Sequence, residues 1–179
     1  IHIILIFTLS LNIHAKTGTV TGLEIPRFVS LKSNEVNLRV GPSTNYPIKL
    51  KYTTKNFPVE IIDEFDAWRE IKDNKGATGW LHKSLIQGTR FVLTGYKSEK
   101  DVNLYDRPDG NMIGTIKKNN ILELKNCILH WCKVGKDNFN GWVLKNNIWG
   151  VYEIEIYKKK IYQPILNYYW KFLNSKFFN

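Results

Sequence analysis

Two cysteines and the histidine between them are the side chains of this sequence whose spacing comes closest to a catalytic arrangement. Cys127 and Cys132 flank His130, and a cysteine nucleophile needs a histidine within reach to remove its proton. We expect the three residues at the tip of a β-hairpin, where the His130 ring cannot easily act as that base. A disulfide between the cysteines would also remove the reactive thiolate. The spacing therefore does not predict a catalytic thiol.

Other catalytic and metal-binding patterns are missing from the sequence. After residue 15 the histidines are His82 and His130, which excludes a three-histidine metal site, and no second Cys or His pair completes a tetrahedral zinc set. There is no Gly-rich phosphate loop and no serine nucleophile elbow. Three acids cluster near a predicted turn, where acids usually cap or face solvent: Asp63, Glu64 and Asp66. We expect a non-enzymatic protein with no cofactor and no metal.

The segments of the chain that would form its strands and turns occur twice in the sequence. Three pairs of segments correspond: 36–43 with 102–110, 68–71 with 131–134, and 79–83 with 141–145. Their order is kept and the offset stays at about 62 to 66 residues, which indicates two copies of one fold. Repeated units of this size with short strands favour a pair of small binding modules over an enzyme.

Each copy has the pattern of short β-strands. Apolar and polar residues alternate through 36–40, 48–52 and 59–61, which is typical of half-buried strands. Turn residues gather at 41–44, 66–67, 74–76 and 108–111. No helical period of useful length occurs between residues 28 and 157. We predict an all-β protein with modules at 28–93 and 94–157, joined near Thr94-Gly95 by an exposed segment open to proteases.

The cysteines predict a disulfide across a hairpin of the second module. The matching stretch of the first copy, 64–69, has the pattern of a hairpin tip, so Cys127 and Cys132 should face each other on neighbouring strands. Their Cβ atoms would then be separated by the ~4 Å that a disulfide requires. Such a bond forms in an oxidising compartment. The alternatives are a buried reduced pair and a metal site, for which this spacing is wide.

Both ends of the chain differ from the repeat. Residues 1–15 hold no Lys, Arg, Asp or Glu, and their apolar run is shorter than the about 20 residues that span a bilayer. They match the apolar part of a secretory signal peptide cut after Ala15, without its basic start; the alternative is a buried strand. Residues 16–27 have the composition of a linker. Residues 158–179 form a basic, aromatic tail, which either contacts a membrane surface or is a frayed terminus.

A formal net charge of +10 favours an acidic partner. Nucleic acid, anionic lipid and anionic polymers all fit that description. The alternative is compositional, because the abundant residues Lys, Asn, Ile, Tyr and Phe all have A/T-rich codons, and such a bias would place lysine on any solvated surface.

The first copy resembles the bacterial SH3-like (SH3b) domains. The resemblance lies in residues 37–47, which read Asn-Leu-Arg-Val-Gly-Pro-Ser-Thr-Asn-Tyr-Pro, and in Trp68 followed by Gly79-Trp80-Leu81. The second copy departs from this motif at 105–108, where Tyr-Asp-Arg-Pro replaces the Arg-x-Gly-Pro turn. Its Cys-Trp-Cys arrangement at 127–132 is similar to exported members of the family. The resemblance covers residues 28–157 and implies two small, partly open SH3-like β-barrels in tandem.

The physical properties of single residues in and near the motif suggest roles for them. Gly41 would permit a positive φ and Pro42 would fix the next φ. Trp80 is expected in the core, and Trp68 either in the core or exposed beside a tyrosine. The structural motif residues are Asn37, Arg39, Gly41, Pro42, Trp80 and Trp142. A ligand-binding set follows from the aromatic and basic residues near the motif: Tyr46, Lys49, Lys51, Tyr52 and Trp68.

Members of this family are often exported proteins of the cell envelope, and some bind peptidoglycan. The resemblance thus implies a periplasmic or envelope protein that recognises cell-wall glycopeptide or an envelope protein. One alternative is a structural adaptor that ties envelope proteins together through its paired modules. A second alternative is a nucleic-acid binder, since small β-barrels stack bases on aromatic side chains over basic grooves; export argues against it.

Overall fold

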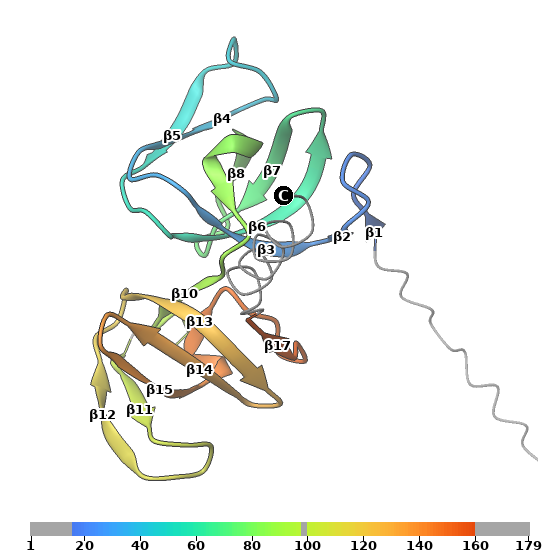
Figure 1. Ribbon diagram of the computed structural model, residues 1–179. Coiled ribbons are helices and arrows are strands. Elements are labelled where there is room, and N and C mark those ends of the chain that lie inside the picture. The colour runs from blue at the N-terminus through green and yellow to red at the C-terminus, as the bar shows by residue number, and fades with distance from the viewer. Residues whose placement is uncertain (1–15, 98–99, 160–179) are drawn as a thin grey trace, which may run out of the picture.

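The protein is built from β-strands and turns. The computed structural model describes residues 16–97 and 100–159, and within these ranges the helical segments are two short 3-10 turns, η1 (Lys83–Leu85) and η2 (Lys145–Asn147). Figure 1 shows the strands gathered into two bodies that follow each other along the chain. No helix in the described ranges has the length and apolar character needed to cross a bilayer. The predicted signal peptide and residues 160–179 of the predicted tail lie outside the described residues.

The first sheet is antiparallel and is hydrogen-bonded in the order β5-β4-β8-β7-β6-β3-β9. Its strands are β3 (Arg27–Leu31), β4 (Val36–Arg39), β5 (Ile48–Tyr52), β6 (Pro58–Phe65), β7 (Trp68–Lys72), β8 (Thr78–His82) and β9 (Ile86–Gln87). A separate pair, β1 (Lys16–Thr17) and β2 (Glu24–Ile25), precedes it.

The second sheet repeats the first strand by strand. Its order is β12-β11-β15-β14-β13-β10-β16, and β17 (Tyr157–Lys158) pairs with β13. The strands are β10 (Phe91–Thr94), β11 (Val102–Tyr105), β12 (Met112–Ile116), β13 (Ile121–Ile128), β14 (Trp131–Lys136), β15 (Phe139–Leu144) and β16 (Ile148–Trp149). Each strand of one sheet has its counterpart at the same place in the other, so the two copies seen in the sequence are two copies of one sheet topology.

The repeat extends to local irregularities. The long strands β6 and β13 both shift register, between Ile61 and Asp63 in one and between Leu124 and Asn126 in the other. Asn56 and Asn119, which precede these strands, both have φ near 60° (66° and 61°), a conformation that asparagine tolerates better than most residues. Asn56 and Asn119 therefore occupy matching positions in the two copies, and the alternation of apolar and polar residues did not reveal this correspondence.

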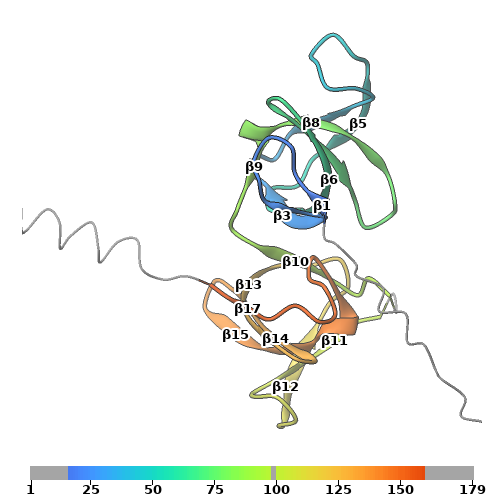
Figure 2. The same cartoon turned by 90° about the vertical axis from the view of Figure 1, so that its right-hand side faces the viewer.

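The prediction of an all-β fold is confirmed, whereas the two partly open barrels that the resemblance implies are not confirmed, because neither sheet closes on itself. Each sheet is an open path of seven strands whose end strands, β5 and β9 or β12 and β16, are not paired with each other. In the two views of Figures 1 and 2 each sheet nevertheless curves around its own interior.

Two separate apolar cores hold the sheets. The first is formed by Ile25, Val29, Leu31, Val36, Leu38, Tyr52, Val59, Ile61, Ile71 and Leu81. The second is formed by Val92, Val102, Leu104, Ile116, Leu122, Leu124, Cys127, Cys132, Val134, Val143 and Ile148. Most of these side chains come from alternate positions of their strands, because successive residues of a strand point to opposite faces.

The chain passes from the first sheet to the second slightly earlier than the expected boundary after residue 93. Strand β10, residues Phe91–Thr94, pairs with β13 and β16 of the second sheet. The expected linker 16–27 contains β1 and β2, and Ile25 within it is 2 % exposed and belongs to the first core. The expected tail from residue 158 begins inside β17, whose Lys158 is paired with Asn126.

The joint near Thr94-Gly95 was expected to be exposed, and that prediction is wrong. Thr94 is fully buried, and its Oγ1 donates to Lys117 O at 2.8 Å. The Gly95 N–H donates to Asn147 O at 2.8 Å. These bonds attach the start of the second module to its own turns and remove the backbone from solvent.

The two modules also pack against each other. The Phe28 ring contacts Trp149 edge-on, with centroids 5.0 Å apart, and Tyr152 at 4.7 Å. The Tyr152 hydroxyl donates to Glu60 Oε1 at 2.8 Å, and burial together with this carboxylate raises the pKa of Tyr152. These contacts join residues of β3 and β6 to the chain after β15. The two modules therefore share an interface and are held together by more than the connecting chain.

The N-terminal hairpin is attached to the first sheet through a buried carboxylate. Glu64 accepts hydrogen bonds from the backbone N–H groups of Val20 (3.1 Å) and Thr21 (2.8 Å). It also pairs with Arg27 at 2.7 Å and with Arg69 at 3.5 Å. The prediction that this acid merely caps a turn or faces solvent is therefore wrong, because its side chain is 0 % exposed. Burial alone would raise the pKa of Glu64, but these hydrogen bonds outweigh it and lower the pKa from 4.5 to about 2.

Candidate functional site

The outer face of strands β7 and β8 carries the aromatic side chains of the predicted site. Arg69, Ile71 and Leu81 point into the protein and are buried, so the alternate residues point outward. Trp68 lies opposite His82 in the register of these strands. Their rings meet edge to face with centroids 5.6 Å apart. Trp68 is half-buried, so one part of the indole packs on the sheet and another part faces solvent.

Trp80 extends this outer face toward β4. It is paired with Glu70 on one side and with Arg39 on the other. The prediction that Trp80 lies in the core is wrong: it is half-buried, and its neighbours Gly79 and Leu81 point inward in its place. Trp80 and Trp68 are diagonal neighbours on adjacent strands, a separation that large aromatic side chains can bridge. The outer face therefore holds two neighbouring cross-strand rows, Arg39–Trp80–Glu70 and His82–Trp68, and we call these five residues the aromatic face.

Tyr46 lies at one end of the aromatic face. Arg39 donates from Nη1 to the Tyr46 backbone oxygen at 2.7 Å, which fixes the loop between β4 and β5. The Tyr46 ring packs on Gly41, where a Cβ atom would approach ring carbons to 2.7 Å. Gly41 does not have the positive φ that we expected. It is glycine because the ring of Tyr46 occupies the place of a side chain.

Lys49 and Lys51 are both exposed on β5, and each has a partner. Lys49 donates from Nζ to the Thr78 backbone oxygen at 2.7 Å, so its ammonium group lies beside the start of β8. Lys51 forms an ion pair with Glu35 at 2.9 Å. Of the two, Lys49 is directed toward the strand that carries Trp80, and Lys51 is partly neutralised.

Tyr52 does not belong to the site, and this part of the prediction is corrected. The side chain is 8 % exposed and lies in the first core. Its ring stacks on Phe57 with centroids 5.5 Å apart, and its hydroxyl donates to Asp73 at 3.2 Å. Burial, followed by the Asp73 charge, raises the pKa of Tyr52. Tyr52 is paired in register with the buried Val36, and it points to the same inner face.

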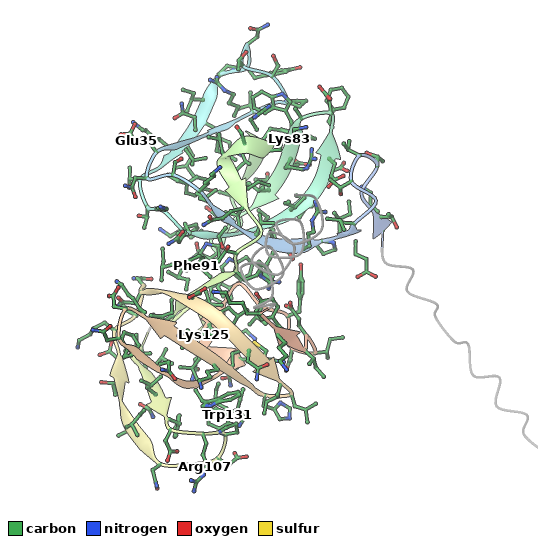
Figure 3. The ribbon with its side chains drawn as sticks, in the orientation of Figure 1. Glu35, Lys83, Phe91, Arg107, Lys125 and Trp131 are labelled. Atoms are coloured by element: carbon green, nitrogen blue, oxygen red, sulfur yellow. A yellow bond between two sulfur atoms is a disulfide. The ribbon has the colours of Figure 1, made fainter. Side chains whose placement is uncertain are left out.

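The corresponding face of the second module is closed by its own aromatic residues. Tyr105 occupies the place of Arg39, since it pairs with Trp142 as Arg39 pairs with Trp80. Its ring meets Trp131 edge-on with centroids 5.0 Å apart, and Trp131 is only 8 % exposed. Figure 3 labels Trp131 on the second module. The first module thus presents the more open aromatic face.

His82 is a site residue that the sequence patterns did not single out. Its ring lies against Trp68, and its Nδ1 is 2.7 Å from Ser84 Oγ. The signal was available in the repeat, because the position of His82 follows Gly-Trp-Leu in the first copy and is occupied by Leu144 in the second. A polar ring replaces an aliphatic side chain at that place.

The cysteine prediction is confirmed. Cys127 and Cys132 are opposite each other on β13 and β14 and form a disulfide, with Cα atoms 4.1 Å apart. Both sulfur-bearing residues are buried in the second core. Among residues 16–97 and 100–159 there is no group of three or more His, Cys, Asp or Glu residues that could hold a metal ion.

Comparison with known proteins places most of both modules in one family. Residues 32–88 and 98–150 match the bacterial SH3 domain. Comparison with curated proteins found no significant match.

Three solved structures are similar to this chain. NlpC2 from Trichomonas vaginalis is 12 % identical over 70 % of this chain and 48 % of its own, with a TM-score of 0.32. The endolysin LysPBC5 CBD is 20 % identical over 68 % of this chain and 90 % of its own, with a TM-score of 0.29. An NlpC/P60 family protein from Bacillus cereus is 12 % identical over 74 % and 57 %, with a TM-score of 0.31. The chain spans about half the length of the Trichomonas protein.

Proposed function

This chain belongs to the bacterial SH3 domain family, and from that premise we propose that it is a non-catalytic, exported protein that recognises cell-wall glycopeptide. The observation that carries the proposal is the aromatic face of the first module, with Trp68 and Trp80 on adjacent strands and Tyr46 at its end. Flat aromatic side chains contribute large contact areas at little entropic cost, and they suit the apolar faces of sugar rings and peptide groups.

The charges around the face fit the same ligand. Arg39 lies opposite Trp80, with Glu70 on the other side of Trp80, and Lys49 lies beside the start of the same strand. Stem peptides of the cell wall carry carboxylates that an ammonium or guanidinium group attracts, and amines that a carboxylate attracts. Because these cations are at the surface, their contribution is screened by salt. The buried disulfide in the second module supports export, since disulfides persist in oxidising compartments. The removal of a signal peptide that precedes the two SH3-like modules remains part of the proposal.

The test is retention on purified, protein-free bacterial sacculi. We expect Trp68→Ala to lower the affinity about tenfold, which corresponds to roughly 1.4 kcal/mol. The control is Trp142→Ala, which removes the counterpart of Trp80 from the corresponding face of the second module and should leave binding within twofold of the wild type. Binding of the wild type should also weaken as salt rises.

The outcomes separate the alternatives. Failure of the wild-type protein to sediment with sacculi at low salt would overturn the cell-wall proposal, and co-purification with envelope proteins in that case would favour the adaptor. Salt-sensitive retention on single-stranded nucleic acid, lost in Trp68→Ala, would favour the nucleic-acid binder. Equal loss of binding in both tryptophan variants would place the ligand outside the aromatic face. Circular dichroism of each variant must show a folded sheet.

A further inference from the structure

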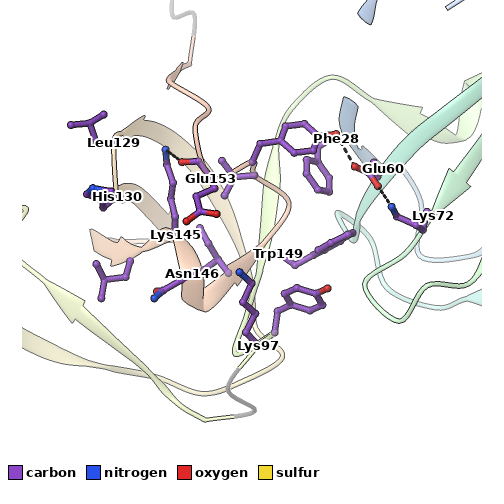
Figure 4. Close-up of a pocket in the computed structure, with 15 residues that line it drawn as sticks. Phe28, Glu60, Lys72, Lys97, Leu129, His130, Lys145, Asn146, Trp149 and Glu153 are labelled. Carbon is purple, nitrogen blue, oxygen red and sulfur yellow. Dashed lines mark hydrogen bonds and ion pairs between the residues drawn. The ribbon is translucent and has the colours of Figure 1, made fainter. Parts of the chain in front are cut away.

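A cavity lies between the two modules, away from the aromatic face. It has a volume of about 530 Å³, within the roughly 300–1,000 Å³ typical of small-molecule sites. Phe28, Glu60 and Lys72 of the first module form one wall, and residues from Tyr96 onward form the others. Figure 4 shows these side chains around the cavity. None of the residues predicted from the sequence to bind a ligand lies in it.

The wall of the cavity is held in place before any ligand arrives. The Trp149 ring is packed between Phe28, at 5.0 Å, and Tyr96, at 4.8 Å between centroids. The hydrogen bond from Tyr152 to Glu60 closes the wall between the modules. A wall that is already ordered adds little to the entropic cost of binding.

One buried polar atom in this wall has neither a hydrogen bond nor an ion pair within the described residues. The Trp149 Nε1 is buried, and within the described part of the chain nothing accepts a hydrogen bond from it. Leaving a buried donor unsatisfied is costly, and most such groups in proteins have a partner. By contrast, Lys145 donates from Nζ to the backbone oxygens of Glu153 and Glu155 at 3.0 and 2.7 Å. The indole N–H is therefore an unsatisfied donor within the wall of the cavity, and a small rotation of the ring would be needed to bring it to an acceptor there.

Among the described residues, two side chains of opposite charge at the cavity make no hydrogen bond or ion pair of their own, although the Lys145 ammonium acts on the charge of Glu153. For residues 16–97 and 100–159, no ion pair or hydrogen bond engages the Lys97 ammonium or the Glu153 carboxylate. Both residues line the cavity, and Figure 4 shows Lys97 near Trp149 and Glu153 beside Lys145. Lys72, in the opposite wall, is already paired with Glu60 at 2.7 Å. One cation and one anion thus remain for a ligand.

From these groups we infer that the cavity binds a short peptide that carries one free carboxylate and one free amine. The carboxylate pairs with Lys97, the ammonium group pairs with Glu153, and a peptide carbonyl accepts the hydrogen bond of Trp149 Nε1. The acidic residues in the walls disfavour polyphosphates, which would need a purely cationic site. That this peptide comes from a cell-wall stem peptide with a diamino acid rests on the proposed function. The inference that the cavity binds a charged peptide does not depend on the proposed function.

The test is a charge-by-charge titration with a defined probe. The probe is N-acetyl-L-alanyl-D-isoglutaminyl-L-lysine, which has one carboxylate and one ammonium group, with its C-terminal amide and its Nε-acetyl form as analogues. Calorimetric titration should show that Lys97→Ala weakens binding of the parent peptide about tenfold, the size expected for a charge-assisted hydrogen bond. The same variant should bind the C-terminal amide no worse than the wild-type protein does.

Two further variants and one control complete the experiment. Glu153→Gln should lose about tenfold for the parent peptide and nothing for the Nε-acetyl form, while Trp149→Phe should weaken all three peptides about fivefold. Lys100→Ala is the matched control, because it removes an exposed lysine near Lys97 that does not line the cavity. It should change no affinity by more than twofold, and thermal melting should show that every variant is folded.

The inference and the proposed function can fail separately. Wild-type protein that sediments with sacculi and ignores the peptide, or peptide binding that is unchanged in all three cavity variants, would overturn the cavity site and leave the aromatic face intact. Peptide binding with the expected charge dependence, in a protein that does not sediment with sacculi, would support the cavity and overturn the proposed function.

Discussion

Acidification should loosen the first module through one carboxylate, Glu64. Its pKa lies at about 2 in the folded protein against 4.5 for an ordinary glutamate. Because the folded pKa is the lower one, the stabilising contribution is complete above pH ~4.5 and is lost as the pH falls toward 2. At 1.36 kcal/mol per pKa unit the contribution is about 3 kcal/mol. The side chain is 0 % exposed, so solvent screens it little.

The assay is denaturant unfolding followed by tryptophan fluorescence between pH 7 and pH 2. Wild-type protein should lose about 3 kcal/mol of unfolding free energy below pH 4.5 through this group. Glu64→Gln should lose a similar amount at pH 7, because the amide cannot compensate the buried guanidinium of Arg69. That variant should then show a shallower pH dependence than the wild type. The control is Asp63→Asn, whose exposed pair with Lys16 should contribute under 1 kcal/mol.

A local measurement separates this mechanism from general acid unfolding. The backbone N–H groups of Val20 and Thr21 are bound to the Glu64 carboxylate, so their hydrogen-exchange protection should fall first, in Glu64→Gln or at low pH. The reasoning would be refuted if Glu64→Gln retained the full pH dependence of the wild type between pH 4.5 and pH 2. It would also be refuted if those two amides stayed protected in the variant.

Three further predictions concern other contacts. Tyr152→Phe removes the hydrogen bond to the buried carboxylate of β6 and should lower the unfolding free energy by about 1–2 kcal/mol, measured by denaturant titration. Gly41→Ala places a Cβ atom 2.7 Å from the Tyr46 ring and should cost about 1–3 kcal/mol; Gly88→Ala, with nothing within 4 Å, should melt like the wild type. Replacing both cysteines by alanine should cost roughly 2 kcal/mol, and mass spectrometry of unreduced, alkylated wild-type protein should find no modified thiol.

Much of the architecture was predictable because it is encoded locally. The duplication is visible as matched segments at a constant offset, and each segment carries its own strand alternation and turn residues. The disulfide followed from the same logic, since Cys127 and Cys132 are five positions apart on either side of one hairpin. A hairpin tip places such residues opposite each other whatever the rest of the chain does.

The candidate site was predictable only in part. An alternating strand has two faces, and the sequence does not show which face points into the core. A shift of one position exchanges the faces of a whole strand. Tyr52 and Trp80 were therefore assigned to the wrong sides: pairing with Val36 directs Tyr52 into the core, and pairing with Arg39 directs Trp80 outward. Trp68 was left open between core and surface, and its place opposite His82 decides it.

By itself, then, the sequence determined the strands, the duplication and the cross-strand disulfide, all of which depend on residues close together in the chain. The tertiary structure alone decided the burial of Glu64 under the N-terminal hairpin and the packing of Phe28 against Trp149. These contacts join residues more than forty positions apart. They depend on how two curved sheets meet, and no local pattern of residue types specifies that geometry.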